Sequence, residues 1–171
     1  MSLPAFAFFY REGFGNPTSD FWMGLQPLYL LTNSGINYLF KVSLILQDGT
    51  IFQQHYVRFW VGDEASGYRL HFSETVPHPA VPLGDSLSTA RGAAFSTYDA
   101  DHDGDVTENC ALRHQSGWWF PNPCNLTEAN PLGRIRHPQD DLWSGEPEDV
   151  FWINDLGGLA PWKVRLWLTQ I

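Results

Sequence analysis

The chain has 171 residues, the size of one domain, and can bury about 70% of the surface that the unfolded chain exposes. Its formal net charge is −9 at pH 7, so Coulomb repulsion opposes binding to nucleic acid phosphates or to an anionic membrane surface. Hydrophobic residues make up 43% of the chain and no low-complexity run is present, which argues against global disorder.

The first stretch with a clear character is the apolar run Leu3–Tyr10. No basic residue precedes it, no small-residue cleavage signal follows it, and it is far too short to cross a bilayer. We therefore expect neither a signal peptide nor a membrane anchor. Residues 18–20 can then cap a short helical turn from Phe21 to Leu25, which Pro27 is expected to end.

Alternating apolar and polar residues predict an antiparallel sheet. Residues 37–47 have the pattern of a half-buried strand, and Asp48-Gly49 is typical of a two-residue hairpin turn. Residues 50–59 are expected to return as the partner strand, with residues 68–72 as a third strand of a meander. Residues 162–169 alternate again and are expected to join the same sheet, which indicates one domain.

From Ser73 onward, prolines and glycines are dense, so we expect this half of the chain to be rich in loops. Within it, residues 98–105 read Tyr-Asp-Ala-Asp-His-Asp-Gly-Asp. Aspartates this close repel one another, and oxygen-rich clusters select a hard cation such as Ca²⁺. An EF-hand would need a bidentate Glu where Cys110 stands and a helix ahead of the loop, and the sequence has neither. A solvated acidic turn without an ion remains the alternative.

Several short motifs follow one another along the chain. They are Arg11-Glu12-Gly13-Phe14-Gly15, Asp20-Phe21-Trp22-Met23-Gly24-Leu25, Leu30-Leu31-Thr32, Gly84-Asp85-Ser86-Leu87, residues 95–103, Asn109-Cys110-Ala111 and Ser116-Gly117-Trp118-Trp119. Any one of them is weak, but the same order over about 100 residues is specific. In order and in rough spacing, the motifs resemble those of the fibrinogen C-terminal (fibrinogen-related) domain.

The resemblance implies an α+β fold, in which a twisted antiparallel sheet with short helices carries a loop-rich region that binds calcium and ligand. We expect a single domain over residues 1–171, with the sheet in residues 11–76 and 160–171 and the loop-rich region in residues 77–159. Residues 1–10 are atypical, because domains of this family normally begin with a further subdomain that has its own cysteine pair.

The resemblance also implies a Ca²⁺ site in the acidic loop, with two side-chain ligands and backbone carbonyls completing the shell. The interval to the first cysteine is one residue longer than usual in the family, so the carbonyl donors could shift to Val106 or Glu108. The implied metal-binding residues are Asp101 and Asp103 through their side chains, and Asp105 and Thr107 through carbonyls nearby.

The two cysteines alone leave a disulfide and two free thiols about equally open. The resemblance implies that Cys110 and Cys124 are bridged, which in the chain-entropy model restricts the unfolded chain by about 3 kcal/mol. It further implies a ligand pocket beside this bridge and a cis peptide between Asn109 and Cys110. The pocket would be formed by Asn109, Cys110, Arg113, His114, Trp119 and Asn125.

Two departures from the family pattern weaken the case for an acetylated sugar as ligand. Asn125 stands where lectin-like members usually carry His, and residues 154–159 replace a stretch that supplies aromatic or basic pocket residues. The pocket is therefore expected to be reshaped or lost. Asn125-Leu126-Thr127 is also a glycosylation sequon, and a glycan on Asn125 would obstruct the same rim, so glycosylation and small-ligand binding there are competing hypotheses.

Catalysis finds little support. The sequence has no Gly-x-Ser-x-Gly elbow, no His-Glu-x-x-His motif and no phosphate-binding glycine loop, and a bridged cysteine pair leaves no thiol nucleophile. The alternative is a hydrolytic zinc site that joins His102, His114 and His137 to the aspartates. We expect no enzyme.

The leading hypothesis is a secreted, calcium-stabilised, lectin-like recognition module that binds an extracellular protein or a glycan. Relatives present such domains in multiples on an upstream stalk, so a homo-oligomer would form through a region that this chain lacks. Two alternatives are a growth-factor-like or fibrin-like ligand that a receptor recognises without any small-molecule pocket, and a degenerate copy that binds nothing.

Overall fold

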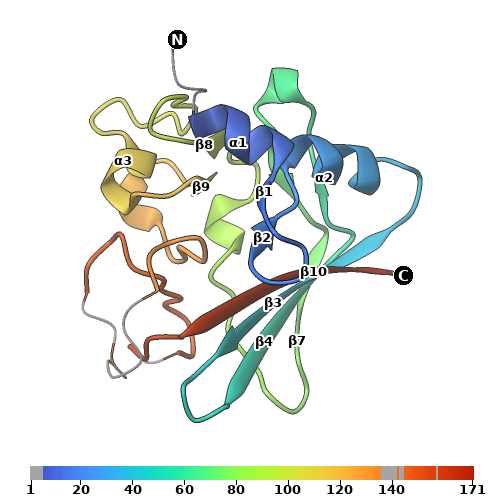
Figure 1. Ribbon diagram of the computed structural model, residues 1–171, viewed down its shortest axis with the longest axis vertical. Helices are drawn as coiled ribbons and strands as arrows, with labels where there is room; N and C mark the ends of the chain where they lie inside the picture. Colours follow the sequence, from blue (N-terminus) through green and yellow to red (C-terminus); the bar gives the residue numbers. More distant parts are fainter. Residues whose placement is uncertain (1–5, 136–141, 143–144, 157) are drawn as a thin grey trace.

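The fold is built around a four-stranded antiparallel sheet in the order β10-β3-β4-β7 (Figure 1). The computed structural model describes residues 6–135, 142, 145–156 and 158–171. The expected α+β class, with short helices beside an antiparallel sheet, is confirmed. The strands of this sheet are β3 (Tyr38–Ile45), β4 (Ile51–Val57), β7 (Glu74–Pro77) and β10 (Lys163–Gln170).

The hairpin between β3 and β4 forms as expected, but its turn is longer by one residue. Leu46 N–H donates to the carbonyl of Thr50 at 2.8 Å, and Gly49 N–H donates to the carbonyl of Leu46 at 3.0 Å. Gly49 has φ 87°, a left-handed conformation that glycine adopts at little cost. The connection is therefore a three-residue loop closed by a left-handed glycine.

Strand β10 joins this sheet at its edge, where Lys163 lies opposite Ile45 and the pairing continues to the end of the strand, which confirms the expected return. The expectation for residues 68–72 was wrong in its pairing. Strand β6 (Leu70–His71) pairs with β5 (Trp60–Val61), and β7 takes the place beside β4. The backbone of Leu70 is occupied elsewhere, because its N–H donates to the carbonyl of Ala93 at 3.0 Å.

Two helices lie beside each other above the sheet in Figure 1, α1 (Phe6–Glu12) and α2 (Leu25–Thr32). The predicted helical turn at residues 21–25 was wrong: β2 (Phe21–Trp22) pairs there with β1 (Phe14–Gly15), and the helix begins at Leu25. Pro27 lies in the first turn of α2, where a backbone N–H would have no partner within the helix, so the helix includes it. No helix within the described ranges is long and apolar enough to span a bilayer.

The described part of residues 78–159 holds only short elements, in agreement with a loop-rich region (Figure 1, left). Trp118 and Trp119 are each 1% exposed, so both belong to the core and neither offers a stacking surface. The remaining elements of the described residues are η1 (Glu64–Ser66), η2 (Ser88–Ala90), β8 (Phe95–Ser96), which pairs with β9 (Trp118–Trp119), α3 (Cys110–His114) and η3 (Cys124–Leu126).

Helix α1 shows that the atypical start of the chain is part of the fold. The hydroxyl of Tyr10, a buried residue, accepts a hydrogen bond from Gly117 N–H at 3.1 Å. At the start of the helix, Ala7 N–H donates to Asp99 Oδ1 at 3.1 Å. The helix thus contacts both the β9 region and the first aspartate of the acidic loop.

Candidate functional site

In the acidic loop between β8 and α3, each of Asp101, Asp103 and Asp105 accepts a hydrogen bond from the backbone N–H two residues further along the chain, which forms a ladder. Asp103 N–H donates to Asp101 Oδ1 at 3.3 Å, Asp105 N–H donates to Asp103 Oδ1 at 2.8 Å, and Thr107 N–H donates to Asp105 Oδ1 at 2.9 Å. Asp side chains favour such local turns. The alternation Asp-x-Asp-x-Asp in the sequence is therefore also the repeat of the backbone turns.

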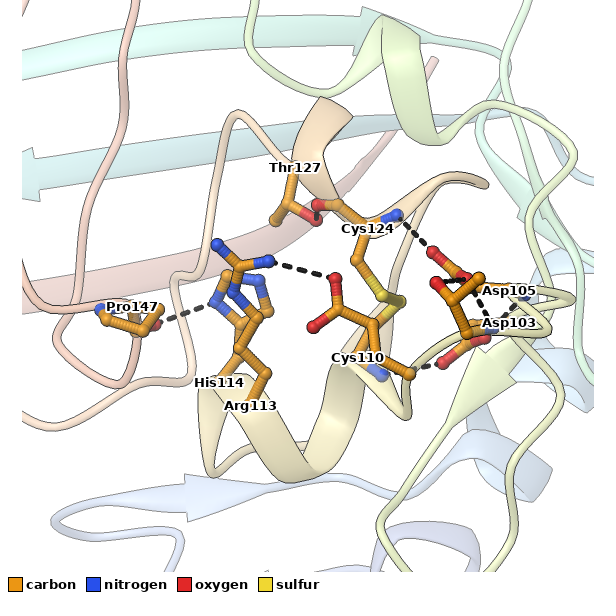
Figure 2. Close-up of polar contacts among 10 residues, drawn as sticks. Asp103, Asp105, Cys110, Arg113, His114, Cys124, Thr127 and Pro147 are labelled. Atoms are coloured by element: carbon orange, nitrogen blue, oxygen red, sulfur yellow. Dashed lines mark hydrogen bonds and ion pairs between the residues drawn. A yellow bond between two sulfur atoms is a disulfide. The ribbon is translucent and has the colours of Figure 1, made fainter.

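The second oxygen of two of these aspartates reaches the disulfide, as Figure 2 shows. Asp103 Oδ2 accepts a hydrogen bond from Cys110 N–H at 2.9 Å, and Asp105 Oδ2 accepts one from Cys124 N–H at 3.0 Å. The acidic loop therefore holds the backbone at both ends of the bridge. Sequence reasoning missed this role, since spacing alone does not show which N–H groups a loop carboxylate will reach.

The bridge itself confirms the implied pairing: Cys110 and Cys124 form a disulfide with a Cα–Cα distance of 5.5 Å. Asn109 caps α3 by accepting a hydrogen bond from Leu112 N–H at 2.8 Å. The implied cis peptide before Cys110 was wrong. The cis bond found among the described residues is Asn122–Pro123, which directly precedes the second cysteine.

The charges along the ladder differ between its two inner members. Burial raises the pKa of Asp103, and the neighbouring carboxyl of Asp101 raises it further against the N–H donors of Cys110 and Asp105. The hydroxyl of Thr107 and the N–H of Cys124 instead hold the pKa of Asp105 at about 2. The charged form is therefore stabilised by local donors at Asp105 and disfavoured by burial at Asp103.

The donor chemistry at Asp101 and Asp103 fits Ca²⁺. Carboxylate oxygens have lone pairs beyond those used for the N–H bonds, and Ca²⁺ takes carboxylates together with backbone carbonyls and water. The carbonyl oxygens of Asp105 and Thr107 accept no hydrogen bond from any described residue, which leaves them free as ligands.

A zinc site has no comparable basis among the described residues. Side-chain donor atoms converge there in two groups, Asp103 with both cysteines and Asp105 with Glu108 and Cys124. The cysteine sulfurs of both groups are in the disulfide, so neither group offers a thiolate. Neither His102 nor His114 joins these groups, and His137 lies outside the described residues.

Three of the six residues expected to line a pocket are buried, which contradicts a rim that includes them. Cys110 is fully buried, and the indole N–H of Trp119 donates to the carbonyl of Tyr68 at 2.7 Å inside the core. His114 is 4% exposed, and its ring stacks on Phe120 with 5.1 Å between the ring centres.

The other three residues face outward to different degrees. Arg113 and Asn125 are exposed and Asn109 is half-buried. The guanidinium of Arg113 pairs with Glu108 at 2.9 Å (Figure 2). In the sequon, Asn125 is exposed, whereas Thr127 is buried and its hydroxyl donates to the carbonyl of Cys124 at 2.7 Å. The surface beside the bridge thus presents these side chains without the aromatic and imidazole groups expected with them.

A buried polar network behind α3 fixes His114. Its Nδ1 lies 2.7 Å from the carbonyl of Pro147, which requires that Nδ1 carry the proton and donate, and burial lowers its pKa (Figure 2). Asn130, which is fully buried, donates to that same carbonyl at 3.1 Å and accepts a hydrogen bond from the hydroxyl of Ser116 at 2.6 Å. A single Asn among prolines gave no sign of this role in the sequence.

The segment that departs from the family pattern has a structural role where it is described. Asn154 N–H donates to the hydroxyl of Ser86 at 2.9 Å, and the indole N–H of Trp152 donates to the carbonyl of Gly84. These hydrogen bonds connect residues 152–154 to residues 84–86, the loop that leads into η2.

Comparison with known proteins adds an independent finding. The family model described as fibrinogen beta and gamma chains, C-terminal globular domain, matches residues 8–163. Tenascin-R of Gallus gallus is 36% identical over 136 residues, which are 78% of this chain and 9% of that protein. Angiopoietin-related protein 6 of Mus musculus is 32% identical over 168 residues, which are 95% of this chain and 33% of that protein. The chain thus spans a minor part of the length of these relatives.

Solved structures agree with this assignment. The fibrinogen-like globe domain of human ANGPTL6 has a TM-score of 0.83 and 29% identity, with 98% of this chain and 71% of that chain covered. The fibrinogen-like globe domain of human ANGPTL2 has a TM-score of 0.80 and 29% identity, with 94% of this chain and 70% of that chain covered. The chain therefore belongs to the fibrinogen C-terminal domain family.

Proposed function

We propose that this domain is an extracellular, calcium-stabilised recognition module without catalytic activity. Family membership supports recognition as the function, and a buried disulfide is the kind of bond that persists in oxidising compartments. In this proposal, Ca²⁺ is held by the side chains of Asp101 and Asp103, with the carbonyls of Asp105 and Thr107 and water completing the shell. The ion supplies positive charge to the loop and takes no part in any reaction.

The observation that carries the proposal is the pair of hydrogen bonds from the acidic loop to the disulfide. Asp103 and Asp105 hold the backbone N–H groups of Cys110 and Cys124. An ion that orders these aspartates would therefore order the surface beside the bridge as well. In this proposal, calcium affects ligand binding without direct contact between the ion and the ligand.

The surface beside the bridge favours a protein as the partner over a small sugar. Its expected aromatic and imidazole groups are buried, whereas Leu112 is 65% exposed and Leu126 is 48% exposed. Exposed apolar residues together with an exposed ion pair, here Arg113 with Glu108, suit a protein interface. This favours the second candidate, in which a receptor recognises the domain without a small-molecule pocket.

We also propose that Asn125 is glycosylated during secretion, because its side chain is exposed. The Thr127 hydroxyl is bound within the folded domain, so the modification would precede folding. A glycan there would cover part of this surface and would again disfavour a small-sugar site. Mass spectrometry of the secreted wild-type chain and of Asn125→Gln tests this, and a wild-type mass equal to that of the unmodified polypeptide would reject it.

The function is tested by presenting the oxidised domain to a glycan array and to a panel of receptor ectodomains, each with calcium and with EDTA. We expect calcium-dependent capture of an ectodomain, and weaker capture by Asp101→Asn. Calcium-dependent sugar binding without a receptor would favour the lectin hypothesis. Binding to neither probe set would support a degenerate copy and contradict the proposal.

A further inference from the structure

A separate hollow of about 410 Å³ borders the acidic loop at residues 102–104. It is within the roughly 300–1,000 Å³ range of small-ligand pockets. It is bounded by the segments 89–94, 102–104 and 120–122 and by Arg69. The implied pocket beside the disulfide does not include it, since none of the six residues expected there lines it.

Two arginines dominate the chemistry of this hollow, although the chain is acidic. Arg69 and Arg91 both line it, and neither forms an ion pair with a carboxylate of the described residues. The chain has 10 Lys and Arg residues against 19 Asp and Glu residues, so two unneutralised guanidiniums in one concavity stand out. Such a concavity focuses positive potential on whatever enters it.

Both guanidiniums are held in place before any ligand arrives. Arg69 donates to the carbonyl of Gly92 at 2.6 Å, and the guanidinium of Arg91 lies 4.2 Å from the centre of the buried Phe72 ring. A stacked or singly bonded guanidinium keeps other N–H groups available, and its fork matches the oxygens of a carboxylate or sulfate. Less side-chain freedom is then lost on binding.

The carboxylate of Asp103 also borders the hollow, but both of its oxygens are already bonded to backbone donors. Asp103 is 6% exposed, and its two oxygens accept hydrogen bonds from Asp105 N–H and Cys110 N–H. The polar groups beside it include His102 and Asn122, whose amide donates to the carbonyl of Gly104 at 2.8 Å. An anion in the hollow would therefore meet two guanidiniums, unpaired among the described residues, and one carboxylate whose oxygens already accept backbone hydrogen bonds.

We propose that this hollow binds an oxyanion carried by a sugar-sized ligand, either a sulfate ester or a carboxylate, through Arg69 and Arg91. The inference rests on the recognition function proposed above and names one ligand chemistry for it. It adds a site at the acidic loop that is independent of the protein-facing surface beside the disulfide.

The test is a titration of the oxidised domain in calcium with glucose 6-sulfate, glucuronic acid and glucose, followed through the amide resonances of Gly92 and Gly104. We expect one or both anionic sugars to shift these resonances and glucose to leave them unchanged. The anionic sugar that binds more tightly identifies the oxyanion. Arg69→Gln and Arg91→Gln should each weaken binding about tenfold, as expected for loss of a charged hydrogen bond.

Two further variants make the test specific. Arg165→Gln removes an exposed cation of β10 outside the hollow and should leave the affinity unchanged. Arg69→Lys keeps the charge but loses the fork and should bind with intermediate affinity, so it stands in if a Gln variant fails to fold. Absence of any shift with both anionic sugars, or an equal loss in Arg165→Gln, would overturn the site. Neither result would change the stabilisation of the domain by calcium. The proposed anion site and the proposed calcium-stabilised module can therefore fail separately.

Discussion

Asp101 and Asp103 differ in a way that their spacing in the sequence does not reveal. Asp101 is exposed, whereas Asp103 is 6% exposed and accepts two backbone hydrogen bonds. Asp103 is therefore needed by the loop itself. Asp101 would serve mainly the proposed ion.

Substitution by Asn separates these two roles. In chelator, Asp103→Asn should destabilise the domain by about 1–3 kcal/mol, because a single amide oxygen cannot serve both buried N–H groups. Asp101→Asn should be close to neutral under the same conditions. Urea unfolding measures both, and equal effects of the two variants in chelator would contradict the difference in roles.

His114 makes stability dependent on pH. Burial lowers its pKa below the usual 6.5, so the unfolded chain takes up a proton at a pH where the folded chain still resists it. The stability that neutral His114 contributes is complete above pH 6.5 and is lost as the pH falls through the folded-state pKa. We expect the free energy of unfolding to decrease from neutral pH toward acid pH.

The variant His114→Asn checks this assignment, since its amide keeps a donor for the carbonyl of Pro147. It should have a shallower dependence of unfolding free energy on pH in urea titrations. His55 and His71, whose pKa values burial also lowers, supply the slope that remains. An unchanged slope in the variant would show that His114 does not titrate as described.

At the scale of the element, the β3–β4 hairpin depends on Gly49. The residue has φ 87°, and a Cβ built there would meet no atom within 4 Å. Gly49→Ala should therefore cost about 1–2 kcal/mol through backbone strain alone. Gly49→Asn should recover part of this loss, because Asn tolerates the left-handed region. Thermal melting measures both variants, and an Ala variant as stable as the wild type would contradict the turn geometry.

The elements differ in how far the sequence could predict them. The alternation of apolar and polar residues in β3 and β10 was sufficient to predict both strands. A two-residue period places the apolar side chains on one face of a strand, and that face can be buried. The turn at residues 21–25 failed because Pro27 was taken as an end signal, although proline is accepted in the first turn of a helix. The pairing of β6 failed because its partners, β5 and the carbonyl of Ala93, depend on tertiary contacts.

Only part of the structure around the candidate site could be predicted from the sequence. The cysteine pairing followed from the family resemblance and is confirmed. Burial of Trp119 and His114 could not be foreseen, since a Trp or His suits a core as well as a rim. The buried role of Asn130 left no periodic signal, because its partners are backbone carbonyls from separate loops.

At the scale of the whole molecule, the disulfide closes a loop across a separation of 14 residues. Replacing both cysteines by alanine should lower the free energy of unfolding by about 3 kcal/mol in the chain-entropy model. Urea unfolding of the oxidised wild type against the double variant measures this. A reductant should leave the double variant unchanged, and equal stability of the two oxidised proteins would contradict a stabilising bridge.

The central claim is that calcium binding to Asp101 and Asp103 stabilises the recognition surface. The most direct measurement is thermal melting of the oxidised domain in calcium and in EDTA. An ion that binds only the folded state, present at about a hundredfold its Kd, contributes about 2.7 kcal/mol and should raise the Tm by about 5–10 °C. Asp101→Asn should lose this rise. Equal melting temperatures of the wild type in calcium and in EDTA would contradict the account.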